Sequence, residues 1–319
     1  MRVFLAGATG VIGRQLVPLL VGAGHAVTTM TRSEARAVEL RQQGTEPVVC
    51  DVFERERLLE VVAAAEPDAV IHQLTSIPGR MNPRRVRQEM AATNRLRAEG
   101  TQVLAEAARA AGVRRMLTQS IAFVYTPQGT ALATEDDPLF RLAPDAFVDL
   151  VDAVDRCEQT TLGIPGVDGV VLRYGHFYGP GTIYARGGSF AADVMRRRVP
   201  IVGDGGSGTF SFVHVADAAT ATLAALAHGP AGIYNVVDDE PAAVRDWLPR
   251  YAELLEAPRP LRVPRGLGRL VGGSFADYLM TQQRGASNAK ARAWLGWEPS
   301  HPSWRDGLLT ETSMEGAGR

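Results

Sequence analysis

The chain has 319 residues, a formal net charge of −1 at pH 7 and two cysteines, Cys50 and Cys157. A charge this close to zero supplies no bulk field for nucleic acid or an acidic membrane surface, and no apolar run is long enough to cross a bilayer. Two cysteines are too few for a disulfide framework, and the six histidines lack the spacing of metal ligands. We therefore expect a cytoplasmic protein of one large or two small domains that binds no nucleic acid, membrane or metal.

The first thirteen residues carry the pattern of a dinucleotide-binding turn. Arg2 to Ala6 is a short apolar run typical of a strand, and Val11 to Leu20 has the apolar spacing of a helix. Three glycines between them permit a tight turn, close approach of a pyrophosphate, and close packing of helix on strand. The free N–H groups at the helix start favour phosphate. The residues predicted to hold the cofactor here are Gly7, Thr9, Gly10, Val11, Ile12 and Gly13.

Short strands and helices alternate through the first half of the chain. Strands are expected at 2–6, 25–30, 47–50, 69–73, 113–119 and 167–174, and helices at 11–20, 33–43, 54–65, 84–111 and 146–162. This alternation predicts an α/β fold with a doubly wound parallel sheet of the Rossmann type. Ligands of such sheets lie at the carboxyl ends of the strands.

The regular alternation of strands and helices ends after Tyr178. Gly-rich loops follow, then helical stretches at 214–227, 242–256, 266–283 and 288–294, with a strand at 233–237. We expect residues 1–178 to form the NADP-binding Rossmann domain, with 209–237 returning to it. Residues 179–208 and 238–319 are expected to form a smaller, mostly helical substrate-binding lobe.

Eight segments spread over nearly the whole chain resemble the extended and atypical short-chain dehydrogenase/reductases, the family that contains sugar-nucleotide epimerases and dehydratases. They are GATGVIG at 7–13, CDVFE at 50–54, VIHQLTS at 70–76, EGTQVLAEAA at 99–108, TQSIAFVY at 118–125, LRYGHFYGPGT at 172–182, FSFVHVADAA at 210–219 and YNVVDDEP at 234–241. The resemblance implies a Rossmann fold and a nicotinamide cofactor, and it is much less specific for the reaction.

The catalytic pair of that family is missing. Its members carry Tyr-x-x-x-Lys on the helix after the fifth strand, but Lys290 is the only lysine here and residue 286 is alanine. Aligning Glu158 with the acid that commonly follows the pair places Leu150 at the tyrosine position and Val154 at the lysine position. The usual proton donor and the lysine that tunes it are therefore absent.

Residues at the ends of the next strands predict a phosphorylated cofactor, NADPH/NADP. Arg32 follows the second strand, where a carboxylate would bind a free ribose 2′-hydroxyl and an arginine favours a 2′-phosphate, with Arg36 one turn on. The alternative for Arg32 is a solvated surface position. Asp51 is suited both to cofactor contact and to starting a helix. Further cofactor contacts are assigned to Asp51, Val52, Leu74, Thr75, Ser76, Tyr174 and His176.

Ser120 and Tyr125 are the candidate catalytic residues. Ser120 ends the fifth strand, where the resemblance places a serine whose hydroxyl donates to a substrate carbonyl as negative charge develops; capping of backbone is the alternative. Tyr125, in the same loop, is a weaker candidate for proton donor, and His176 and Tyr178 are comparable alternatives. His72 and His214 are expected to be structural. A mostly solvated helix face is expected from Arg84, Arg85, Arg87, Arg95 and Arg97, with the alternative that one of them points to the cleft.

A reductase that works without the tyrosine is the function we expect. Hydride transfer survives that loss if the substrate spreads the new negative charge or gives up a proton of its own phenol. This chemistry is similar to that of atypical ketoreductases of aromatic polyketide (angucyclinone) antibiotic biosynthesis. The prediction is NADPH-dependent reduction of a ketone on a bulky aromatic polyketide by a monomer or homodimer. A non-catalytic NADP(H)-sensing regulator and a sugar-nucleotide epimerase or dehydratase stay open as alternatives.

Overall fold

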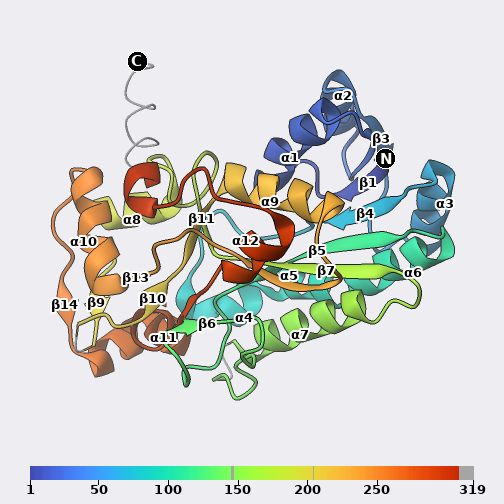
Figure 1. Cartoon of the computed structure of the whole chain (residues 1–319). Helices are drawn as coiled ribbons and strands as arrows, with labels where there is room; N and C mark the ends of the chain where they lie inside the picture. The colour runs from blue at the N-terminus through green and yellow to red at the C-terminus, as the bar shows by residue number, and fades with distance from the viewer. Residues whose placement is uncertain (145–146, 204, 309–319) are drawn as a thin grey trace.

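A seven-stranded parallel sheet forms the centre of the computed structural model, which describes residues 1–144, 147–203 and 205–308 (Figure 1). The strand order is β12-β7-β5-β4-β1-β2-β3, so the chain changes direction across the sheet between β1 and β4. Ligands of doubly wound sheets bind at such a switch point. The strands are β1 (Arg2–Ala6), β2 (Ala26–Thr31), β3 (Glu46–Val49), β4 (Ala69–His72), β5 (Arg115–Ile121), β7 (Asp168–Tyr174) and β12 (Gly232–Val236). The predicted Rossmann fold is confirmed.

Helices cover both faces of the sheet, as Figure 1 shows. One face carries α1 (Val11–Gly22), α2 (Glu34–Gln42), α9 (Val215–Ala227) and α12 (Ala289–Leu295); the other carries α3 (Arg55–Ala65), α6 (Thr101–Ala110) and α7 (Val148–Leu162). Successive strand residues serve opposite faces, because side chains alternate along a strand. In β1, Leu5 packs with the α1–α9 side and Phe4 with the α3–α6 side.

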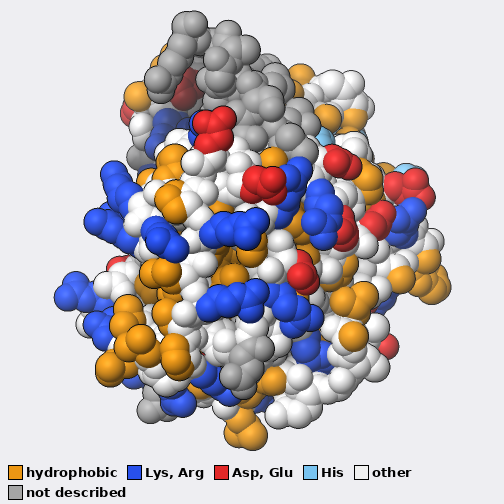
Figure 2. All heavy atoms as spheres, turned by 90° about the vertical axis from the view of Figure 1, so that its left-hand side faces the viewer, with side chains coloured by type: hydrophobic (Ala, Val, Ile, Leu, Met, Phe, Trp, Pro, Cys, Tyr) orange, Lys and Arg blue, Asp and Glu red, His pale blue; other side chains and the backbone are white. Residues whose placement is uncertain are grey.

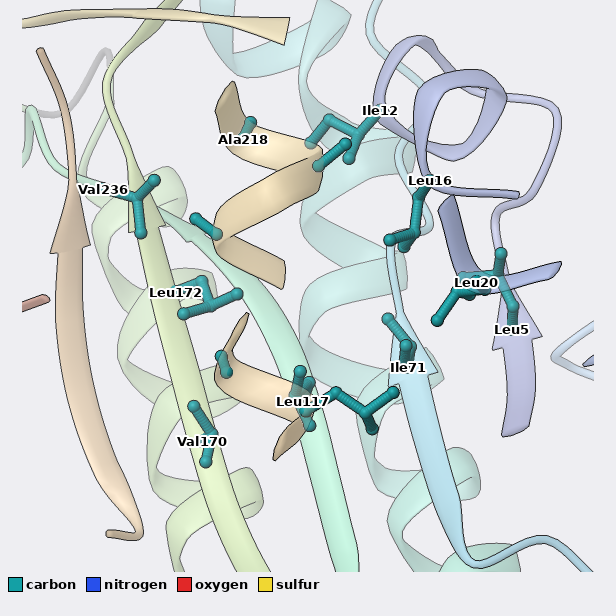
Figure 3. Packing of buried hydrophobic residues seen from close by; sticks show 14 of the residues in the cluster. Leu5, Ile12, Leu16, Leu20, Ile71, Leu117, Val170, Leu172, Ala218 and Val236 are labelled. Carbon is teal, nitrogen blue, oxygen red and sulfur yellow. The ribbon is translucent and has the colours of Figure 1, made fainter. Parts of the chain in front are cut away.

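The α1–α9 face holds an aliphatic core that fixes the first helix against the sheet. In Figure 3, Ile12, Leu16 and Leu20 of α1 approach strand residues, and Ala218 of α9 lies nearby. Each fully buried Leu or Ile contributes roughly 1.5–3 kcal/mol. This packing holds the start of α1 at the carboxyl edge of the sheet.

The helix expected at 84–111 is divided into five short pieces. They are η1 (Pro83–Arg85), α4 (Val86–Glu89), α5 (Ala91–Arg95), η2 (Leu96–Gly100) and α6 (Thr101–Ala110). Met90 breaks the first part with φ −90° and ψ −4°, and η2 is a π-helical turn. A π turn takes in an extra residue and changes the direction of the side chains around it. The prediction of one continuous helix is therefore wrong. Arg97 lies in the π turn and its side chain is buried, unlike the solvated face expected for it.

The remaining elements form helices and two-stranded ladders around an aromatic core that includes Phe212, Trp247 and Tyr251. They are β6 (Leu132–Ala133), β8 (His176–Tyr178), α8 (Ser189–Met195), β9 (Ile201–Val202), β10 (Thr209–Phe210), β11 (Phe212–His214), β13 (Ala242–Ala243), α10 (Val244–Leu254), β14 (Arg262–Val263), α11 (Arg265–Thr281) and β15 (Gly285–Ala286). Three parts of the predicted elements lie outside the described residues. They are Ala146 of the helix predicted at 146–162, Asp204 of the predicted glycine loop, and residues 309–319 of the predicted lobe.

The face on the α8, α10 and α11 side is rich in basic groups. Figure 2 shows Lys and Arg side chains spread across its middle, with apolar side chains at one side. Exposed apolar residues of α11 include Leu267, Leu270 and Val271. Within the described part of the chain, no helix combines the length and apolarity needed to cross a membrane.

Candidate active site

The glycine turn between β1 and α1 has the shape that a pyrophosphate requires. Gly7 has φ +104°, and a Cβ there would lie 2.6 Å from the carbonyl group of Gln73. A Cβ on Gly13 would lie 2.2 Å from the carbonyl oxygen of Gly7, so only glycine lets α1 approach so closely. Gly10 caps α1 without a side-chain hydrogen bond, which leaves backbone N–H groups for an anion. Thr9 and Val11 lie at the surface side of this turn, while Ile12 is buried in the core.

A hollow beside the turn is lined by two arginines as well as two acids. Its lining residues are Arg32, Val49, Cys50, Asp51, Glu54 and Arg57. Arg32 is largely exposed and lies 3.7 Å from Asp51, a loose ion pair that a phosphate would outcompete. Arg36 donates to the hydroxyl of Thr9 at 3.2 Å, which joins it to the glycine turn. Arg57 was missed because it lies inside a helix whose charge pattern resembles an ordinary solvated face.

Asp51 and Val52 hold the loop that bounds the hollow. Asp51 accepts from the N–H of Phe53 at 3.0 Å, and its own N–H donates to Glu54 at 3.0 Å. The side chain thus caps a turn ahead of α3, whose N-cap is Glu54. Val52 is buried and would contact a Cβ on Gly100 at 3.5 Å.

The segment after β4 is open to solvent at the switch point. Leu74 is partly buried, whereas Thr75 and Ser76 are exposed. The N–H of Leu74 donates to His72, and that of Ser76 donates to the hydroxyl of Thr93. These bonds hold the segment in place beside the glycine turn. His72 has the structural role expected: burial, and then Arg97, lowers its pKa to about 4, and it bonds to Thr101.

Ser120 belongs to a buried ionic network. Its hydroxyl donates to Glu158 at 2.6 Å, and Arg173 holds the same carboxylate through bonds of 2.8 Å and 2.5 Å. All three side chains are almost completely buried. The hydroxyl would have to leave Glu158 to donate to a substrate carbonyl, so the catalytic role of Ser120 stays a prediction.

Tyr125 lies at the other end of this network. Its hydroxyl accepts from Arg173 at 2.8 Å and donates to the side-chain oxygen of Asn235 at 2.6 Å. Burial raises the pKa of Tyr125 to about 12, even though Arg173 acts in the opposite direction. A phenol this weakly acidic, with its proton already donated, is a poor proton source.

Tyr174 and His176 occupy different environments at the end of β7. The hydroxyl of Tyr174 bonds to Gln73 and Thr222 inside the core, so its side chain is not available to a cofactor. His176 lies between Phe123 and Phe210, with ring centroids 4.4 Å and 4.2 Å away. Burial lowers the pKa of His176 to about 4, so its ring is neutral at pH 7. The two phenylalanine rings therefore cover both faces of the imidazole.

The position of the missing catalytic pair is filled by hydrophobic packing. Leu150 and Val154 on α7 lie in a buried cluster with Ile121, Phe147 and Tyr278. Their side chains are 3% and 0% exposed. None of these groups can donate or accept a proton at neutral pH except the Tyr278 hydroxyl, which donates to the carbonyls of residues 123 and 125. The described residues at this position thus provide no acid–base pair.

A second group of polar residues brings together distant parts of the chain. The ligand atoms of His214, Asp217 and His301 lie within 4.8 Å of one another, and the contribution of His301, far along the chain from the other two, was not visible in the sequence. Asp217 accepts from Ser300 and His301, and the two imidazole rings stack at 3.8 Å. His214 also caps α9 by accepting from the N–H of Ala216, as expected of a helix-start residue.

The sequence matches the model of the NAD dependent epimerase/dehydratase family over residues 3–236. The chain belongs to this family. Family membership, together with the glycine turn, supports an oxidoreductase with a nicotinamide cofactor.

Two relatives are reductases by name. A 3-diazoavenalumate denitrifying reductase of a Streptomyces species is 46% identical over 312 residues, which cover 98% of this chain and 100% of that protein. A 4-hydroxy-2-methyl-3-oxo-4-farnesyl-3,4-dihydroquinoline-1-oxide ketoreductase of Stigmatella aurantiaca is 28% identical over 254 residues, covering 78% of this chain and 71% of that protein.

Solved structures share the fold at low identity. The dTDP-glucose 4,6-dehydratase of Streptomyces venezuelae, crystallised with NAD, superimposes with a TM-score of 0.77 and 20% identity over 100% of this chain and 98% of that one. The UDP-glucose 4-epimerase of Thermotoga maritima, with UDP-glucose, gives a TM-score of 0.76 and 20% identity over 99% of both chains.

Proposed function

We propose that this protein is an NADPH-dependent reductase that removes the diazonium group of an aromatic acid as dinitrogen. The observation that carries the proposal is the apolar cluster around Leu150 and Val154, where the described residues hold no acid–base pair. The 46% identity to a 3-diazoavenalumate denitrifying reductase supports the choice of substrate class.

This reaction suits a site without a proton donor. When bound, a reduced nicotinamide supplies a hydride equivalent. The net change breaks the aryl carbon–nitrogen bond, forms an aryl carbon–hydrogen bond with that hydride and releases dinitrogen, and it takes up no proton. Reduction of a ketone requires a proton as well as a hydride, which is the task of the missing tyrosine. The side chains at this site therefore need only bind, orient and exclude water.

The aromatic substrate is inferred from the name of the 46% identical relative. The partly buried ring of Phe123, stacked on His176 beyond the end of β7, is the aromatic side chain that we expect nearest to it. An aryl diazonium is also stabilised by conjugation, whereas an alkyl diazonium would decompose before it is bound. A neutral His176 adds no charge that would repel the cationic diazonium.

The choice of NADPH rests on Arg32, Arg36 and Arg57. Arg32 and Arg57 line the hollow at the ends of β2 and β3. Arg36 is hydrogen-bonded to Thr9 of the glycine turn. An arginine beside a ribose 2′-phosphate forms charge-assisted hydrogen bonds that a free hydroxyl does not. Asp51 holds Arg32 within reach of the hollow until the phosphate is bound.

Reduction of a ketone on an aromatic natural product is the second candidate. It is favoured by the 28% identity to a ketoreductase and by the predicted role of Ser120. The proton would then come from a phenol of the substrate or from water, because Tyr125 is a poor donor.

Turnover of paired substrates tests the proposal. The purified protein is mixed with NADPH and either an aryl diazonium carboxylate or the ketone of the same ring system, and NADPH loss and dinitrogen release are followed together. We expect one dinitrogen per NADPH with the diazonium, far above the rate without protein. Reduction of the ketone alone would favour the second candidate. Tight NADPH binding without transfer to either class would contradict both and indicate a cofactor sensor.

A further inference from the structure

The first half of α11 is amphipathic in the reverse of the usual sense. Leu267, Leu270 and Val271 lie at helical spacing on one side of the helix, and they are 51%, 70% and 63% exposed. The side that packs on the protein carries Gly268, where a Cβ would come within 2.3 Å of Val202. A surface helix of a soluble protein normally turns its large apolar side chains inward. This half of the helix therefore presents an apolar stripe that nothing in the described structure covers.

The stripe projects from the protein as a ridge. Every residue from 265 to 271 except Gly268 is exposed, and Gly273, with φ +79°, separates this half of the helix from the rest of α11. Arg84 donates to the backbone oxygen of Leu270, which ties the ridge to η1 and so to the segment that follows β4. Residues 262–271 are termed the α11 ridge below.

Arginines surround the α11 ridge. The sequence from 257 to 276 contains no Asp or Glu. β9 pairs with β14, and Arg197, after α8, donates to the backbone oxygen of Arg259 at 3.1 Å, so the arginine run 196–198 lies on the same face. Figure 2 shows this face, with its basic side chains across the middle and apolar ones at one side. The exposed arginines of the face that form no ion pair with any described residue are Arg196, Arg259, Arg262 and Arg269.

Two other occupants of this face fit its chemistry less well. A second copy of the chain that presented the same face would place arginine against arginine, which is repulsive. A protein partner is usually held by buried Trp, Tyr or Phe, whereas Leu and Val rarely carry the binding energy. The α11 ridge contains no aromatic residue.

An anionic lipid surface matches both features of the ridge. Helices that lie in the membrane interface insert Leu and similar side chains at the boundary between headgroups and acyl chains, with Lys or Arg beside them. The long arginine side chains reach the lipid phosphates while their stems stay in apolar contact. A cluster of unpaired arginines is attracted to anionic headgroups over about a Debye length.

We propose that the α11 ridge docks the protein onto the surface of an anionic phospholipid bilayer. Leu267, Leu270 and Val271 enter the headgroup boundary, and the unpaired arginines contact lipid phosphates. Such a contact lies on the membrane surface and requires no spanning helix. The expectation that the protein binds no membrane came from the net charge of −1, which averages over the molecule and conceals a cationic face. The docking is independent of the cofactor and of the reaction.

Vesicle sedimentation tests the docking directly. The full chain, without cofactor, is mixed with vesicles of phosphatidylglycerol or of phosphatidylcholine at low and high salt, and the bound fraction is measured. We expect binding to phosphatidylglycerol that falls steeply with salt, and little binding to phosphatidylcholine. Failure to bind phosphatidylglycerol vesicles at low salt would overturn the inference.

Two double variants test whether the ridge itself makes the contact. Arg262→Ser with Arg269→Ser should weaken binding to phosphatidylglycerol roughly twenty-fold, at about five-fold for each arginine lost. Leu267→Ser with Leu270→Ser should weaken it by about ten-fold or more, because two inserted side chains are lost. All four positions are exposed, so the melting temperature should stay near that of the wild-type protein.

Matched pairs elsewhere on the surface serve as controls. Arg41→Ser with Arg109→Ser, and Val38→Ser with Leu142→Ser, change exposed side chains on other elements and should leave vesicle binding nearly unchanged. Equal weakening by these pairs would contradict a local docking site. Weakening by the arginine pair of the ridge alone would indicate adsorption by charge without insertion, also against the proposal. Self-association that the leucine pair abolishes, without vesicle binding, would instead identify a protein–protein interface.

Discussion

Arg32 is the residue at which the choice between NADPH and NADH is expected to be made. It lines the hollow at the end of β2 and forms an ion pair with Asp51 at 3.7 Å, in which the Arg32 side chain is largely exposed. A weak exposed pair of this kind is readily exchanged for a phosphate. Arg57 on the same hollow, carried by α3, supplies a second cation.

Replacing Arg32 by alanine should weaken the affinity for NADPH and leave the affinity for NADH nearly unchanged. The lost charge-assisted hydrogen bond is worth about 1.5–3 kcal/mol, or roughly ten- to hundred-fold in the dissociation constant. Titration of both cofactors by fluorescence measures the effect, with Arg41→Ala on the exposed end of α2 as the control. Equal weakening of NADPH and NADH would show that Arg32 does not contact the 2′-phosphate.

Glu158 has a stabilising role that the sequence did not reveal. It neutralises Arg173 inside the protein through two hydrogen bonds, and both side chains are less than 5% exposed, at 3% and 4%. Glu158→Gln would leave the charge of Arg173 buried without its partner. We expect a loss of about 3–5 kcal/mol in the free energy of unfolding.

Denaturant unfolding measures this loss against a surface pair. Asp149→Asn removes the partner of Arg87 in a pair where both side chains are about half exposed, at 57% and 48%. That change should cost less than about 1 kcal/mol. Similar losses in Glu158→Gln and Asp149→Asn would contradict the role assigned to the buried network.

At the scale of elements, the turn between β1 and α1 depends on the absence of side chains. A Cβ on Gly13 would overlap the carbonyl of Gly7 at 2.2 Å, so Gly13→Ala has to push α1 away from β1. Ile12, Leu16 and Leu20 would then lose part of their packing against the sheet (Figure 3). The start of α1 would also move away from the phosphate position.

Gly13→Ala should therefore lower both stability and cofactor affinity. Overpacking of this kind costs about 1–3 kcal/mol, and we expect the melting temperature to fall accordingly. Gly22→Ala, at the open end of the same helix, should be neutral or stabilising by up to about 1 kcal/mol, because a Cβ there meets nothing within 4 Å. Thermal unfolding of the two variants would contradict this account if Gly13→Ala were as stable as Gly22→Ala.

The elements also show what a sequence can predict. The glycine turn and the parallel strands follow from local sterics and spacing, and the structure confirms them. The Glu158–Arg173 pair joins a helix to a strand, and nothing in either segment alone predicts their contact. Arg97 was misplaced because its burial depends on the π turn, which interrupts the helical spacing.

At the scale of the whole molecule, the fold is shared with sugar-nucleotide enzymes, so the side chains at the ends of the strands must determine the reaction. The sheet and glycine turn are those of the epimerase/dehydratase family (Figure 1). Leu150 and Val154 replace the proton-transferring pair by packed hydrophobic groups. Under the proposed function, such a site would only have to hold a hydride donor against a substrate that needs no proton.

The most direct test of this claim is the origin of the new hydrogen atom. The protein is supplied with an aryl diazonium carboxylate and NADPH that carries deuterium at the transferred position, in ordinary water, and the product is examined by mass spectrometry and NMR. We predict one deuterium at the ring carbon that carried nitrogen, with dinitrogen released in equal amount. A product that carries hydrogen from water at that carbon, despite NADPH consumption, would contradict direct hydride transfer.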